Sequence, residues 1–178
     1  MARCYPMNAL TRWNGLPAAA AEQELLACCA APAWAHAVTA GRPYPDGPAL
    51  RAAATAVLAD QPWSQIESAL AAHPRIGERK TPASGDAAWS AGEQRAALSP
   101  DAGPSAALAA DLVDANRTYE ARHGFLFIVC ATGRTADAML ADLRARTPRP
   151  LADELRTAAE EQIKITRLRL HKLLGELA

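Results

Sequence analysis

The longest regular pattern in this sequence runs from about Leu151 to Leu177, where apolar residues recur at helical spacing on two faces of one predicted helix. Such a helix needs partners on both sides, so we expect it to cross the middle of a bundle. Alanine is abundant elsewhere, and apolar residues again recur at helical rather than alternating spacing. The sequence therefore predicts an all-α, single-domain helical bundle of about eight helices, with no linker that would divide residues 1–178.

Turn residues and prolines bound the other expected helices. These helices are expected at Pro17–Ala30, around Trp34 to Val38, at Ala49–Leu58, from Asp60 to His73, from Ser90 over a short stretch, at Ser105–Arg122 and at Thr135–Arg146. The stretch Glu78 to Ala88 is expected to be a polar loop. Gly124 to Ala131 would be a strand if taken alone, but it has no second strand to pair with. We interpret it as a buried extended segment that leads into the next helix.

Composition narrows the range of partners. The 19 basic and 19 acidic residues balance, so the positive excess typical of proteins that bind nucleic acid or anionic membranes is absent. No run approaches the roughly 20 apolar residues of a membrane span, and the first 15 residues lack the apolar core of a signal peptide. We therefore expect a cytoplasmic protein that binds neither nucleic acid nor membranes, with a small neutral or anionic ligand.

The cysteines and most histidines show no spacing typical of a metal site. Cys4, Cys28, Cys29 and Cys130 match neither a zinc motif nor a disulfide framework, and are expected to be small buried hydrophobes in a reducing compartment. The other histidines, His36, His123 and His171, have no spaced acidic or cysteine companions. No metal site is expected.

An imidazole and a carboxylate are expected near each other at two helix ends. His73 continues the apolar stripe of the helix that Pro74 ends, so its side chain should face inward. Ser90 and Glu93 match a capping box, which would hold the carboxylate rigidly at a helix start. A positioned histidine and carboxylate suit acid/base chemistry without metal or cofactor. The alternatives are purely structural: a histidine that caps a carbonyl, and a capping box alone.

Two arginines lie among apolar residues of the last helix, Arg167 on one side and Arg169 on the other, and periodicity does not choose between them. A buried arginine keeps its charge and needs a carboxylate partner, either from the protein, such as Glu93, or from a ligand. The remaining charged residues nearby are expected to form a solvated face without function. They are Arg144, Arg146, Glu160, Glu161, Lys164 and Lys172.

Several motifs in a fixed order resemble the OHCU decarboxylases, enzymes of urate breakdown that act on 2-oxo-4-hydroxy-4-carboxy-5-ureidoimidazoline (OHCU). The motifs are His73-Pro74-Arg75-Ile76-Gly77, Ser90-x-x-Glu93-Gln94, Asn116-x-x-Tyr119 before Gly124-Phe125-x-Phe127-Ile128-Val129-Cys130, and Lys164-Ile165-x-x-Leu168-Arg169-Leu170. Cys28-Cys29, Trp34 and Arg42-Pro43 also match, so the resemblance covers nearly the whole chain.

The resemblance implies the family's all-helical fold, usually a homodimer, and decarboxylation of OHCU to (S)-allantoin without a cofactor. It makes His73 and Glu93 the catalytic pair, with Arg169 completing the site through the family's Leu-Arg-Leu pattern. The residues that would hold the substrate are Pro74, Ser90, Gln94 and the backbone of Phe127, Ile128, Val129, Cys130 and Ala131. Leu126 stands where the family commonly has proline, a departure that changes no reactive group.

Two other classes of function remain as alternatives. A non-catalytic helical module could bind a ureide in the same pocket, but a pure binder has no need of a rigid inward histidine and carboxylate. A helical nucleic-acid binder is disfavoured by the zero net charge and the lack of a basic helix.

Overall fold

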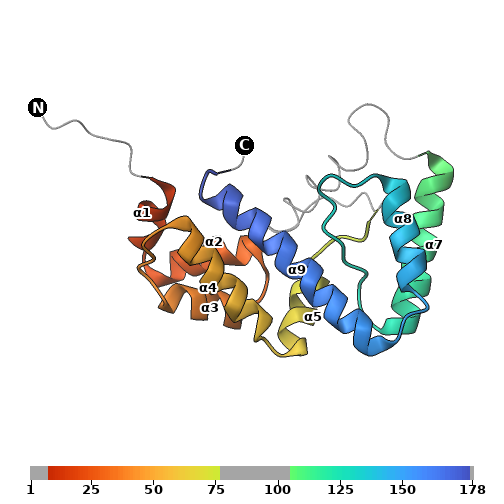
Figure 1. The fold of residues 1–178 in the computed structure, drawn as a ribbon, viewed down its shortest axis with the longest axis horizontal. Helices are drawn as coiled ribbons and strands as arrows, with labels where there is room; N and C mark the ends of the chain where they lie inside the picture. Colours follow the sequence, from red (N-terminus) through yellow and green to blue (C-terminus); the bar gives the residue numbers. More distant parts are fainter. Residues whose placement is uncertain (1–7, 77–104, 177–178) are drawn as a thin grey trace, which may run out of the picture.

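The computed structural model describes residues 8–76 and 105–176, and within these ranges it contains eight α-helices and no strand (Figure 1). The predicted all-α fold is confirmed. The helices are α1 (Ala9–Asn14), α2 (Ala18–Cys28), α3 (Pro32–Ala40), α4 (Gly47–Ala59), α5 (Trp63–Ala71), α7 (Ala106–His123), α8 (Ala136–Arg146) and α9 (Leu151–Leu173).

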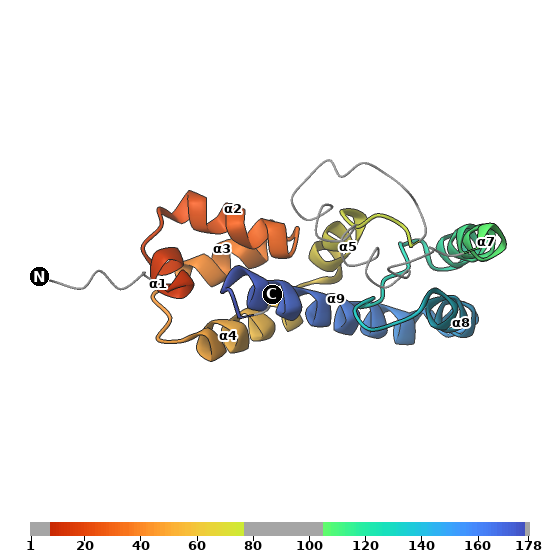
Figure 2. The same ribbon diagram turned by 90° about the horizontal axis from the view of Figure 1, so that it is seen from above.

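Helix α9 crosses the molecule, as its two apolar faces predict. In Figure 1 it runs diagonally from the group α1–α4 at one end to α7 and α8 at the other, with α5 beside its middle. It packs against α2, α4 and α5, while α7 and α8 pack against each other. Figure 2 shows the same arrangement from above, with α7 and α8 together at the end of the molecule away from α1–α4. Helix α9 therefore extends through both ends of the fold.

Polar side chains mark the starts of four helices, which explains why most boundaries follow from the sequence. Asn8, Asp46, Ser105 and Thr135 each accept a hydrogen bond from the backbone amide three residues later, at 2.7 to 3.2 Å. Prolines stand in the first turn of α3 and α4, where a missing amide hydrogen costs nothing. Observed and predicted starts agree to within two residues for α2, α4, α7 and α8.

Three details of the predicted helices were wrong. Helix α1 was not expected at all; the Asn8 cap and the buried Trp13 stabilise it. Helix α5 ends at Ala71 rather than at His73, and the His73 amide bonds to the Leu70 carbonyl at 3.0 Å in a tighter closing turn. Helix α9 ends at Leu173 rather than near Leu177, because Gly175 turns the chain with a φ of +69°.

The segment from Gly124 to Ala131 forms no strand, as predicted; after the bend at Gly124 and Phe125 it is extended, and most of its side chains are buried. Gly124 ends α7 with a φ of +81°, a left-handed conformation that glycine adopts without strain. Phe127 is almost completely buried and meets the ring of Tyr119 edge-on, with ring centroids 5.2 Å apart. We call Gly124–Ala131 the extended segment below.

In the part of the chain that the structure describes, no helix combines the length and the apolar character that a transmembrane span requires.

Candidate functional site

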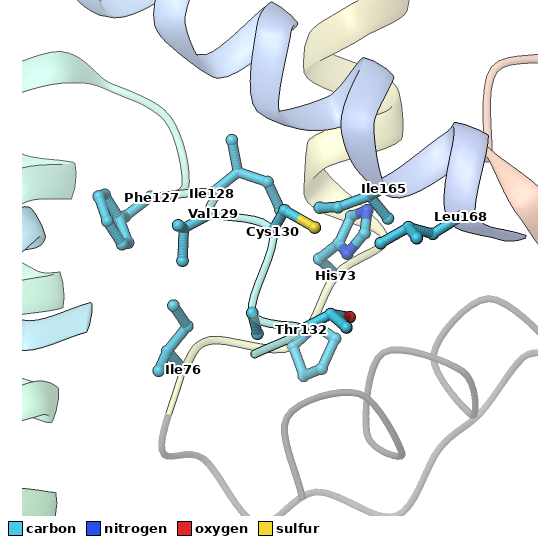
Figure 3. Close-up of a pocket in the computed structure, with 11 residues that line it drawn as sticks. His73, Ile76, Phe127, Ile128, Val129, Cys130, Thr132, Ile165 and Leu168 are labelled. Carbon is cyan, nitrogen blue, oxygen red and sulfur yellow. The ribbon is translucent and has the colours of Figure 1, made fainter. Parts of the chain in front are cut away.

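A pocket lies where the residues after α5, the extended segment and α9 meet (Figure 3). Its lining residues are His73, Pro74, Ile76, Phe127, Ile128, Val129, Cys130, Ala131, Thr132, Ile165 and Leu168. Residues that the sequence places more than 50 positions apart, His73 and Phe127, thus share one pocket. Most of the lining residues are apolar, and His73 adds a titratable side chain. Small-molecule sites usually combine an apolar lining with a few polar groups in this way.

His73 is buried and is held in place by α9. Its Nε2 lies 3.0 Å from Oε1 of Gln162, a completely buried residue. Burial, and to a lesser extent the nearby positive charge of Arg169, together lower the pKa of His73 from 6.5 to about 3. The imidazole is therefore neutral near pH 7 and carries a lone pair that can accept a proton. A helix-end cap on solvent would not be buried in this way.

Acidification is expected to destabilise the protein partly through His73. Between pH 6.5 and about 3 the unfolded chain binds a proton on this histidine that the folded protein does not. The free energy of unfolding should fall as the pH is lowered, by up to about 1.4 kcal/mol per pH unit. His73→Asn lacks this contribution, so urea unfolding over the same range should show a shallower pH dependence. Equal slopes for the variant and the native protein would contradict the lowered pKa.

The structure decides between the two arginines of α9. Arg169 is completely buried, whereas Arg167 is exposed and lines a separate surface hollow with Arg51. The Arg169 Nη1 atom donates a hydrogen bond to the Cys28 carbonyl at 3.2 Å. The Arg169 charge acts on the pKa of His73, so the guanidinium lies near the imidazole. Arg169 is thus the arginine that the structure brings to the site.

Two charged residues of the expected solvated face are instead buried and hold the extended segment. Arg146 of α8 donates from Nη1 to the Ile128 carbonyl at 2.9 Å, and its guanidinium lies 4.5 Å from the centre of the Phe127 ring. Glu161 of α9 accepts a hydrogen bond from the Cys130 amide at 2.7 Å. The expectation of a solvated face was wrong for both, because their partners come from a segment that carries no helical pattern.

Arg146 is itself held by a buried carboxylate. Glu154 is completely buried and accepts hydrogen bonds from Arg146 Nε at 3.0 Å and from the Tyr119 hydroxyl at 2.7 Å. Arg149 forms an ion pair with the same carboxylate at 2.9 Å. Burial raises the pKa of Tyr119, which keeps its hydroxyl protonated as a donor. This network fixes α7, α8 and α9 against the extended segment, and so fixes one wall of the pocket.

The structure brings His73, Pro74 and the five residues Phe127 to Ala131 to one pocket. The other three polar residues predicted for the site, Ser90, Glu93 and Gln94, lie outside the described residues, as do Gly77 and the expected loop Glu78 to Ala88. The catalytic and binding roles of all these residues stay predictions.

Sequence reasoning missed Gln162, which bonds His73, and four residues that line the pocket. Gln162 lies on the same face of α9 as Ala158, Ile165 and Arg169, so it interrupts an apolar stripe, and this signal could have found it. The missed lining residues are Ile76, Thr132, Ile165 and Leu168.

The cysteines agree in part with the expected packing role. Cys28 and Cys29 are completely buried, while Cys130 is half-buried at the pocket. Cys4, for which the same role was predicted, lies outside the described residues. Within residues 8–76 and 105–176, no three histidine, cysteine, aspartate or glutamate side chains converge as metal ligands would.

The fold and the site together define an all-helical protein with a largely apolar small-molecule pocket and a buried, neutral histidine in its wall. The family model for OHCU decarboxylase matches residues 14–171, most of the chain. The chain therefore belongs to the OHCU decarboxylase family.

Curated relatives agree with this membership. The chain is 34% identical over 159 residues to the uric acid degradation bifunctional protein TTL of Arabidopsis thaliana, which covers 88% of this chain. It spans about half of that protein, 48% of its length. It is 32% identical to the 2-oxo-4-hydroxy-4-carboxy-5-ureidoimidazoline decarboxylase of Amia calva, covering 80% of this chain and 81% of the relative. The enzyme of the same name from Bos taurus is 34% identical, with coverages of 82% and 84%.

Solved structures give the same result for the fold. A crystal structure of OHCU decarboxylase in the presence of (S)-allantoin superimposes with a TM-score of 0.73 at 32% identity, covering 86% of this chain and 98% of that one. A crystal structure of (S)-allantoin synthase superimposes with a TM-score of 0.66, covering 93% of this chain and 54% of that one. At 20% identity, this second likeness shows the fold alone.

Proposed function

We propose that this chain decarboxylates OHCU to (S)-allantoin without a cofactor, in the breakdown of urate. The observation that carries the proposal is the pocket in which neutral, buried His73 faces the extended segment, with Arg169 beside it, in a chain of this family. The relatives from Amia calva and Bos taurus carry the name of that enzyme, and one solved relative was crystallised in the presence of (S)-allantoin.

The substrate supplies its own electron sink. The carboxylate of OHCU is attached to a ring carbon next to a C=N bond. When the bond to the carboxylate breaks, its electron pair forms a C=C bond between the two ring carbons, and the former C=N pair moves to nitrogen, which takes a proton. The hydroxyl then loses its proton to become a carbonyl, and the carbon that bears the ureido group gains one. Carbon dioxide and allantoin then account for every atom of the substrate carboxylate and for one proton taken from the solvent.

We assign the hydroxyl proton to His73. A neutral imidazole within hydrogen-bond reach of that hydroxyl can polarise it by accepting its hydrogen bond, and can take its proton as the carbonyl forms. Arg169 would bind anionic oxygen or hold Glu93 ionised. Glu93 would orient the ureido side of the substrate or deliver the proton that completes the product. His73 and Glu93 could exchange these two roles.

The extended segment would hold the ring and ureido carbonyls through backbone groups that are already fixed. The Cys130 amide is engaged by Glu161, so Cys130 would act by keeping the neighbouring peptide groups in position. Pro74, Ser90 and Gln94 complete the proposed binding residues. A fixed wall on one side of the planar intermediate restricts proton delivery to one face, so that a single enantiomer, (S)-allantoin, forms.

Incubation with freshly generated OHCU tests the proposal and separates an enzyme from a non-catalytic ureide binder. The expected result is that OHCU disappears in proportion to protein concentration, with release of carbon dioxide and many turnovers per chain. Saturable binding of OHCU with the decay rate of the protein-free solution would favour the non-catalytic module.

The single domain of residues 1–178, the cytoplasmic location and the homodimer are further proposals. The resemblance to the family supports the homodimer. Light scattering of the full chain after size-exclusion chromatography should give twice the mass of 18.8 kDa, and the mass of one chain would contradict it.

The variant Glu93→Gln distinguishes a catalytic role of this carboxylate from a purely structural role in a capping box. If Glu93 acts on the substrate, the variant should lose about 10² or more in kcat, the usual scale for removing a positioned acid/base group, while its thermal midpoint changes little. If Glu93 only completes a capping box, glutamine makes the same backbone bond and the change should be nearly silent. Steady-state kinetics and thermal unfolding of one preparation decide, and native kcat in the variant would remove Glu93 from the mechanism.

A further inference from the structure

We propose that Gln162 and Thr166 of α9 are positioning residues that fix His73 in the tautomer with its proton on Nε2. This inference rests on the proposed function, because the tautomer matters to catalysis only if His73 acts on the substrate. One buried chain of hydrogen bonds connects Thr166 to Gln162 and Gln162 to His73. The three side chains are buried, with exposed fractions of 2%, 0% and 9%, respectively.

Thr166 determines which end of the Gln162 amide faces it. The Thr166 hydroxyl donates its only proton to the backbone carbonyl of Gln162, at 2.9 Å. Toward the Gln162 side chain, the same hydroxyl oxygen can therefore only accept. The amide nitrogen of Gln162 lies 3.2 Å from it and donates to it, and the same nitrogen donates to the Cys29 sulfur at 3.5 Å. The Thr166 hydroxyl oxygen, whose proton is already donated, therefore requires the NH₂ end of the amide on this side.

The other end of the amide then determines the histidine tautomer. With its nitrogen toward Thr166, Gln162 presents its carbonyl oxygen to His73 Nε2 at 3.0 Å. A carbonyl oxygen only accepts, so Nε2 must carry the proton. A reversed amide would place two acceptors, Gln162 Oε1 and Thr166 Oγ1, against each other in a buried site, which costs the free energy of an unsatisfied polar group.

The proton on Nε2 leaves the lone pair of the neutral ring on Nδ1. Figure 3 shows one ring nitrogen of His73 directed toward α9 and the other directed away from that helix. The nitrogen that takes the proton of the substrate hydroxyl is therefore assigned to Nδ1. In the opposite tautomer this atom would carry a proton and could not act as the base.

The tautomer can be measured directly in the full chain without substrate. Long-range ¹H–¹⁵N correlation spectra of ¹⁵N-labelled protein distinguish a protonated from an unprotonated ring nitrogen, and His73→Asn identifies the His73 signals by their loss. The expected result near pH 7 is Nε2 protonated and Nδ1 unprotonated. A protonated Nδ1 in the native protein would overturn the inference. This readout is independent of turnover, so a failure of the proposed function leaves it unchanged.

Thr166→Val removes the acceptor that orients the amide while keeping the shape of the side chain. The Nδ1-protonated form should appear in the spectrum, and kcat should fall by about 10-fold or more, the usual scale for an outer group that orients a reactive one, with KM less affected. Thr166→Ser keeps the hydroxyl and should keep the native spectrum. A native tautomer and native kcat in Thr166→Val would show that Thr166 does not orient the Gln162 amide.

Two further variants keep the test decisive. Thr118→Val removes the same type of bond, a hydroxyl donating to the carbonyl four residues earlier at 2.9 Å, from the exposed face of α7. It should change neither the His73 signals nor kcat. Gln162→Leu removes the acceptor itself and tests the inference if Thr166→Val does not fold. It should abolish the preference for Nε2–H, and an unchanged tautomer would overturn the part given to Gln162.

Discussion

His73→Asn is expected to lower kcat by about 10² to 10⁴, the range for a general base, while the protein remains folded. Asparagine keeps a polar group beside Gln162 but has no group that accepts a proton near pH 7. Because His73 lies in the turn after α5, its replacement interrupts no helix. Steady-state kinetics with OHCU measure the loss, and far-ultraviolet circular dichroism confirms that the helices remain.

His36→Asn is the matched control for this change. His36 is an exposed histidine whose side chain is 77% accessible and whose ring contacts only Glu22 among the ion pairs of the described residues. Its replacement should leave kcat unchanged. If His73→Asn turned over OHCU as fast as His36→Asn, His73 would have no part in the chemistry.

Glu154→Gln is expected to lower the free energy of unfolding by about 3 to 5 kcal/mol, the cost of leaving a buried charge without its partner. Glu154 is completely buried, and Arg146, which donates to it at 3.0 Å, is almost so. Glutamine keeps the size of the side chain but leaves the Arg146 charge without its nearest carboxylate. Urea unfolding of the variant and the native protein measures the difference.

Asp111→Asn provides the comparison with an exposed ion pair. Asp111 and Arg144 lie 2.8 Å apart, but both side chains are more than half accessible. Its replacement should cost about 0 to 1 kcal/mol, as exposed pairs usually do. If Glu154→Gln were no more destabilising than Asp111→Asn, the buried network would not hold the fold as described.

Loss of the Glu154 carboxylate should also disturb the wall of the pocket. Arg146 connects Glu154 to the extended segment, through its hydrogen bond to the Ile128 carbonyl and its contact with the Phe127 ring. Any folded fraction of Glu154→Gln is therefore expected to have a poorly fixed pocket wall. This links a structural residue of α9 to the substrate site without direct contact between them.

Helices with a clear apolar period could be predicted from the sequence because their caps and stripes are local. The capping residues Ser105 and Thr135 are the predicted first residues of α7 and α8, and Asp46 lies three residues before the predicted start of α4. Helix α1 escaped prediction because its six residues are too few for a period to appear. Its stability depends on burial of Trp13 by distant parts of the chain.

Site residues that belong to sequence motifs could be predicted, whereas residues that reach the site through partners distant in the sequence could not. His73, Pro74 and the extended segment were found through a break in an apolar stripe and through the resemblance to a family. Gln162 was missed because its partner His73 is 89 residues away, and nothing in local periodicity pairs them. Glu161 and Arg146 were misplaced on a solvated face for the same reason, since helical position alone does not show that an extended segment covers them.

We propose that this pocket removes carbon dioxide from OHCU and that the resulting planar intermediate is protonated on one face. Circular dichroism of the product formed from freshly generated OHCU tests it most directly, because the uncatalysed reaction has no chiral environment and must give both hands. The expected result is an excess of (S)-allantoin that forms faster than allantoin forms without protein. Racemic allantoin, formed at the rate of the protein-free solution, would contradict the account.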